Sequence, residues 1–162
     1  LLRRFGRVRG IRFEPLSPQG HAGDHWHEIG ISHGQRCEAM IQTLNAWWPR
    51  RSYLPPISPL DEMLGSLQGG ATASACLGQR SASMTEIDRH GIHERCVALQ
   101  GPAPIPTIPL YCLQCQWQAH CRYGCPALPF LDGDTCRSGA TLWHACQQLL
   151  QQSPNRSGTD HD

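Results

Sequence analysis

Residues 112–126 read CLQCQWQAHCRYGCP and hold four of the nine cysteines of this 162-residue chain. Disulfides, zinc sites and iron–sulfur clusters all use cysteines at such density. Continued to Cys136, the spacing is C-x2-C-x5-C-x3-C-x10-C. An odd number of cysteines argues against a closed disulfide framework, so the stretch indicates a thiolate-bound metal centre.

The composition limits the possible partners. Net charge is +1 with histidines neutral, and the basic residues are scattered arginines with no lysine, so the sequence predicts neither a nucleic-acid nor a membrane partner. No apolar run reaches the length of a membrane span, and the N-terminus lacks the apolar core of a signal peptide. We therefore expect a cytoplasmic protein, where thiols stay reduced and dense cysteines favour metal binding or catalysis.

The N-terminal part predicts a strand followed by a loop. Residues 8–14 (VRGIRFE) mix β-branched, aromatic and charged residues and stop at a proline. The next residues are rich in Pro and Gly and carry His21, His25 and His27, which we expect in a solvated loop. The alternative is that His25 and His27, two residues apart near the strand end, face a substrate. The chain starts without Met and opens into this strand, which suggests a piece of a longer polypeptide.

Helices and a hairpin are expected further on. From the N-cap Ser32, apolar residues recur at three- and four-residue spacing until Pro49 ends the helix. The other expected elements are a short helix at 59–68 closed by Gly69 and Gly70, a β-hairpin within 76–100 whose second strand starts at Gly91, a Pro-rich connector at 101–109, a helix at 139–152 capped by Ser138, and a disordered tail at 153–162.

Upstream cysteines complete an ordered template. Before the Cys112–Cys136 stretch, Cys76, Gly91 and Cys96 are spaced C-x14-G-x4-C. Together, seven cysteines and one glycine resemble the SPASM domain, the C-terminal extension of many radical SAM enzymes, at every fixed spacing. The segment SPQGHA (residues 17–22) is similar to the P-x-G-[RH]-A loop that commonly follows the last barrel strand of such enzymes.

The resemblance implies an α+β fold, in which the end of a (β/α) radical SAM barrel, its last strand and helix, leads into a small, loop-rich SPASM domain with a β-hairpin and a C-terminal helix. Residues 1–68 would be the barrel remnant with its connecting helices, 69–152 the auxiliary-cluster domain and 153–162 the tail.

The resemblance also implies two auxiliary 4Fe-4S clusters. The outer cluster would be held by Cys112, Cys115, Cys121 and Cys136, and the inner one by Cys76, Cys96 and Cys125. In two-cluster ferredoxins, too, the cysteine that precedes a proline ligates the other cluster, and Cys125-Pro126 has that form. A fourth ligand of the inner cluster is not assigned; Cys37 is a remote candidate.

Other residues have simpler interpretations. Cys37 and Cys146 lie on apolar helix faces, where a cysteine is usually a small buried hydrophobe. Trp117 is expected to pack and exclude water from the cluster. Glu14, at the end of the barrel strand, is the best candidate for a substrate or cofactor contact, although a plain strand-end carboxylate is an equal alternative.

The function that the resemblance implies is that of a radical SAM maturase acting on a ribosomally made peptide or protein. Its auxiliary clusters would accept an electron or anchor the substrate. The CxxxCxxC loop that binds S-adenosylmethionine is absent from this sequence. The implied partners are therefore the remainder of the barrel, an electron donor and the peptide substrate, and no catalytic residue is assigned.

Two alternatives stay open. Zinc also takes four thiolates and uses C-x2-C pairs, but zinc ribbons pair two short knuckles, whereas this chain has one such pair followed by longer gaps. A zinc site would make the chain a structural or binding module. A stand-alone SPASM protein, serving as partner or electron carrier, is the second alternative.

Overall fold

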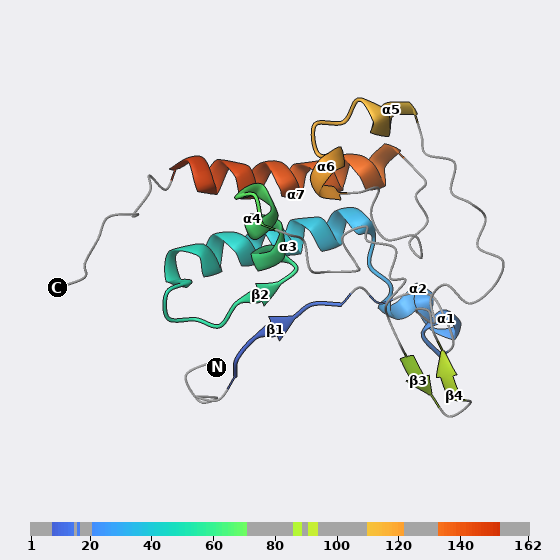
Figure 1. Cartoon of the computed structure of the whole chain (residues 1–162). Coiled ribbons are helices and arrows are strands. Elements are labelled where there is room, and N and C mark those ends of the chain that lie inside the picture. The colour runs from blue at the N-terminus through green and yellow to red at the C-terminus, as the bar shows by residue number, and fades with distance from the viewer. Residues whose placement is uncertain are drawn as a thin grey trace.

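A computed structural model of the chain describes residues 8–14, 16, 21–70, 86–88, 91–93, 110–121 and 133–152 (Figure 1). The elements in chain order are β1 (Ile11–Arg12), α1 (His21–Asp24), α2 (Trp26–Ile29), α3 (His33–Trp47), the 3-10 turn η2 (Trp48–Arg50), β2 (Ile57–Ser58), α4 (Leu60–Leu67), β3 (Glu86–Asp88), β4 (Gly91–His93), α5 (Leu110–Leu113), α6 (Gln118–Cys121) and α7 (Gly133–Gln152).

Helix α3 begins and ends as the sequence predicts. The Ser32 hydroxyl accepts a hydrogen bond from the Gln35 backbone N–H at 3.2 Å, and the Gln35 side chain accepts one from the Ser32 N–H at 2.8 Å. This capping box satisfies two N–H groups that the first helical turn leaves without partners. At the other end Pro49 falls in the 3-10 turn η2, so α3 stops at Trp47.

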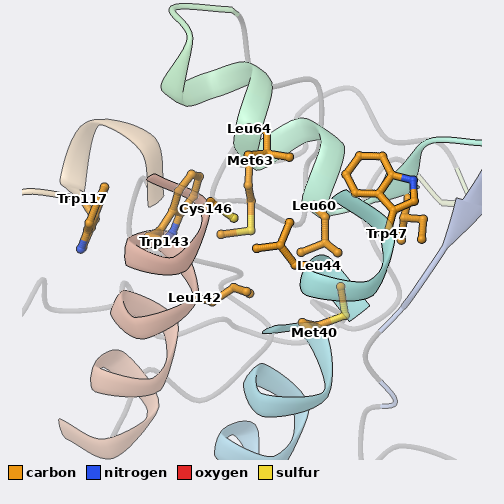
Figure 2. Close-up of a cluster of buried hydrophobic side chains, with 11 residues drawn as sticks. Met40, Leu44, Trp47, Leu60, Met63, Leu64, Trp117, Leu142, Trp143 and Cys146 are labelled. Carbon is orange, nitrogen blue, oxygen red and sulfur yellow. The ribbon is translucent and has the colours of Figure 1, made fainter. Parts of the chain in front are cut away.

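The core lies between α3, α4 and α7. The two long helices run side by side in Figure 1, and α4 packs against α7. Figure 2 shows their apolar side chains meeting in one cluster. Leu44, Leu60 and Cys146 have no exposed surface. The other members are Met40, Trp47, Ile57, Met63, Leu64, Trp117, Leu142 and Trp143.

Short helix α4 ends as expected. Gly69, two residues after the last residue of α4, adopts a φ of 85°, a left-handed conformation that glycine adopts without steric cost. The next amide, that of Gly70, donates to the Gly65 carbonyl at 2.8 Å. The helix therefore ends at the Gly69-Gly70 pair, as predicted.

Two small sheets are present among the described residues. Strands β1 and β2 pair in parallel, with Ile11 opposite Ile57, and the Phe13 N–H donates to the Ser58 carbonyl at 3.0 Å. The expected strand at 8–14 thus exists but is paired over only two residues, because its partner β2 is equally short. Strands β3 and β4 form the predicted antiparallel hairpin, and Gly91 starts its second strand.

Two predictions about local structure were wrong. The histidine-bearing segment after β1 forms the short helices α1 and α2 instead of a loop, because the carbonyls of His25 and Trp26 accept hydrogen bonds from amides three and four residues ahead. Helix α7 starts at Gly133 rather than after Ser138, so Cys136 belongs to a helix.

The core takes residues from both predicted segments, since α3 and α4 precede residue 69 and α7 follows it. The boundary at 68/69 stays a prediction. The connector at 101–109 and the tail at 153–162 lie outside the described residues. None of the helices in the described part of the chain combines the length and apolar run needed to cross a bilayer.

Candidate metal centre

The segment from Cys112 to Cys121 folds into three consecutive turns. Cys112 lies in α5, and its carbonyl accepts a hydrogen bond from the Cys115 amide at 3.3 Å. The Cys115 carbonyl then accepts from the Gln118 amide at 3.0 Å, and α6 ends at Cys121, whose amide donates to the Trp117 carbonyl at 2.7 Å. The x2 gap thus corresponds to one turn, and the x5 gap to the turn at 115–118 followed by the turn of α6.

Three of the four thiols predicted to bind the outer cluster interact with one another. Burial raises the pKa of Cys112, and the nearby thiols of Cys136 and Cys115 raise it further. Burial followed by Cys115 likewise raises the pKa of Cys136, whereas a hydrogen bond from the Cys112 side chain lowers it. Like charges oppose ionisation, so these shifts place the Cys112, Cys115 and Cys136 side chains in one neighbourhood.

The fourth predicted ligand, Cys121, is partly buried and packs against the hydrophobic core, as does Cys115. The six described cysteines are not in disulfides. Within the described ranges, no three His, Cys, Asp or Glu side chains are positioned to hold a metal ion as they stand. The thiols are therefore close to one another, but their sulfur atoms are not arranged around one common point as they would be around a bound metal.

The donor set fits an iron–sulfur cluster by its chemistry. Iron in such clusters is bound by cysteine thiolates, and the interacting thiols come from α5, the following turn and the first turn of α7. Ligand loss is costly when a site joins separate elements, because binding free energy then becomes folding free energy.

The cysteine segment is anchored to the core by aromatic and polar contacts. Figure 2 shows the rings of Trp117 and Trp143 of α7 next to each other. Trp117 is 5% exposed, and the two rings stack with centroids 6.3 Å apart. His120 also lies against Trp143, at 5.6 Å, and its Nδ1 is 2.9 Å from the hydroxyl of buried Ser66. The expectation that Trp117 packs is confirmed, since Trp117 belongs to the hydrophobic core.

The remaining predicted site residues are spread out or undescribed. Cys76, Cys96 and Cys125 lie outside the described residues. Cys37 is buried on α3, and its sulfur is 3.4 Å from His33 Nε2. Glu14 is exposed at the end of β1 and pairs with Arg12 Nε at 2.5 Å.

Sequence reasoning missed three contacts. The Cys37–His33 pair is recognisable from its i, i+4 spacing on a helix. The Ser66–His120 hydrogen bond and the Trp117–Trp143 stack join residues far apart in the chain, and no local pattern indicates them. The role of Glu62 was not predicted either. Its Oε1 accepts a hydrogen bond from the Ser58 hydroxyl at 2.5 Å, and its buried Oε2 has no hydrogen-bond partner among the described residues.

Cys146 gives a pH-dependent stability prediction. Burial raises its pKa from 9.0 to about 12. At high pH the folded chain therefore keeps a proton that the unfolded chain loses. The contribution of this buried thiol to the free energy of unfolding is complete below pH 9 and is lost as the pH rises toward 12. Between about pH 9.5 and 10.5, the free energy of unfolding should fall by about 1 kcal/mol more in wild type than in Cys146→Ala, measured by urea denaturation. Equal losses would contradict this assignment.

Comparison with known proteins gives no family for this chain: no family model, no curated protein and no solved structure matches it.

Proposed function

We propose that this chain is the C-terminal auxiliary-cluster region of a radical SAM/SPASM maturase that modifies a ribosomally made peptide or protein. The cysteine template supports the family, and the interaction of Cys112, Cys115 and Cys136 is the observation that carries the proposal. These thiols are separated by up to 23 intervening residues in the sequence, yet Cys136 and Cys115 raise the pKa of Cys112, and Cys115 raises the pKa of Cys136.

Within the proposal, the residues of this chain have distinct tasks. Cys112, Cys115, Cys121 and Cys136 would hold the outer 4Fe-4S cluster, and Cys76, Cys96 and Cys125 the inner one. A bound 4Fe-4S cluster supplies one-electron chemistry. The stack of Trp117 on Trp143 excludes water from the core side of the cysteine segment. Ser66 fixes the ring of His120 beside Cys121 and so positions α6.

Glu14 remains our candidate for contacting S-adenosylmethionine or substrate. Its carboxylate is 57% exposed at the end of β1, so a ligand held by other barrel strands can reach it. We propose further that the rest of the barrel, an electron donor and the peptide substrate are the partners of this chain, and that it acts in the cytoplasm.

Redox spectroscopy tests the proposal against a zinc-binding module. We expect the anaerobically reconstituted protein, reduced with dithionite, to show the electron paramagnetic resonance signals of reduced 4Fe-4S clusters, because the thiolates hold redox-active iron. Zinc has no redox chemistry, so a zinc protein treated in the same way gives no signal. A silent spectrum together with stoichiometric zinc would overturn the proposal in favour of the module.

A further inference from the structure

A histidine-rich face lies on α1 and α2, apart in sequence from every cysteine. His21, Asp24, His25 and Glu28 follow one another at spacings of three and four residues across the two short helices. His25 lies between the two helices as the N-cap residue of α2, so contacts between these side chains, rather than one continuous helix, bring them together. The rings of His21 and His25 form an edge-to-face pair with centroids 5.2 Å apart.

Each of these two histidines has a carboxylate near its Nδ1 atom. The Nδ1 of His21 is 3.8 Å from Asp24 Oδ2, and the Nδ1 of His25 is 3.7 Å from Glu28 Oε2. Histidines that bind metals commonly direct one ring nitrogen to a carboxylate and use the other as the ligand. In both residues the carboxylate faces Nδ1, which leaves Nε2 as the nitrogen for a ligand.

The spacing of the rings suits a shared ion. Two imidazoles bound to one tetrahedral ion with metal–nitrogen bonds of about 2.0 Å have ring centres roughly 5 Å apart. The observed 5.2 Å between His21 and His25 agrees with this value. Both side chains are exposed, His21 by 92% and His25 by 49%, so they can turn toward an ion without disturbing the core.

We propose that His21 and His25 form a binding site for a late first-row divalent metal ion, with Asp24 and Glu28 as the carboxylates that orient their rings. Neutral imidazole suits zinc, copper and nickel, and water completes the coordination. Only two protein side chains bind directly, since no group of three or more His, Cys, Asp or Glu within the described ranges is placed to hold an ion.

His27 provides a matched control on the same segment. It is 75% exposed and also pairs with Glu28, but through Nε2 at 3.3 Å, and it is two residues from His25, a spacing that places it on a different side of the helix. The two sites proposed for this protein are chemically independent, because residues 21–29 contain no cysteine.

Nuclear magnetic resonance of protein labelled with 15N in its histidine rings tests the site residue by residue. Added Ni²⁺ should broaden the ring signals of His21 and His25 at concentrations about tenfold lower than that of His144, since the second imidazole binds intramolecularly. His25→Ala should raise the Ni²⁺ concentration that broadens His21 by about tenfold, whereas His27→Ala should leave it unchanged.

The carboxylates are tested in the same titration. Glu28→Gln should weaken broadening at His25 by about tenfold, because it removes the group that orients the ring, and Asp24→Asn should do the same at His21. If His21 and His25 broaden no earlier than His144, or if His25→Ala leaves His21 unaffected, the proposed site does not exist. Neither result depends on whether the cysteines hold iron.

Discussion

Cys136→Ala is expected to remove about half of the iron that the anaerobically reconstituted protein binds, because one of two proposed clusters loses a ligand. Cys136 lies in α7, while its neighbour Cys112 lies in α5. Their hydrogen-bonded thiols link these two elements. Losing Cys136 therefore removes the ligand by which α7 takes part in the site, and metal analysis after reconstitution measures the effect.

Cys146→Ala is the matched control for this experiment. Cys146 lies on the same helix, but it has no exposed surface and belongs to the hydrophobic core. The variant should keep its full iron content and lose only packing energy. Cys115→Ala and Cys121→Ala should behave like Cys136→Ala. Iron loss in Cys146→Ala, with iron retained in Cys136→Ala, would show that the ligands are wrongly assigned.

Leu44→Ala is expected to lower the free energy of unfolding by about 3–5 kcal/mol, because it leaves a cavity in a core that cannot fully collapse. Leu44 has no exposed surface and lies on α3, the helix that packs most extensively against α7. Since single domains are stable by only about 5–15 kcal/mol, the loss would approach the total. Urea denaturation measured by circular dichroism would report it.

Leu110→Ala is the control for the core substitution. Leu110 is 82% exposed at the start of α5, so its removal should change the free energy of unfolding by less than about 0.5 kcal/mol. Similar losses in Leu44→Ala and Leu110→Ala would mean that the α3–α7 interface is not the main core of the protein.

The helices that form this core could be predicted where capping and periodicity agree. Ser32 followed by apolar residues at helical spacing defines α3, and the face of Leu142, Cys146 and Leu149 defines most of α7. The start of α7 could not be predicted, because glycine is a poor helix former and Ser138 is a suitable N-cap residue. Glycine costs a helix only about 1 kcal/mol, which tertiary packing of a long amphipathic helix can outweigh.

Short helices and contacts between residues far apart in the chain could not be predicted from the sequence for a different reason. The four-residue helices α1 and α2 are too short to show an apolar repeat, so their histidines read as part of a loop. The pairing of Ser66 with His120 depends on how α4 meets α6. The cysteine spacing indicates which side chains belong together, but the structure is needed to see that Cys136 reaches the others from a helix.

Native mass spectrometry of the anaerobically reconstituted protein tests the central claim, that these cysteines hold iron–sulfur clusters, most directly. It weighs the intact protein with its bound metal and sulfide. Seven thiolates in the observed spacing predict a mass increase equal to two 4Fe-4S clusters, and Cys136→Ala should retain one. A mass increase equal to zinc ions without sulfide, in wild type and variant alike, would contradict the account.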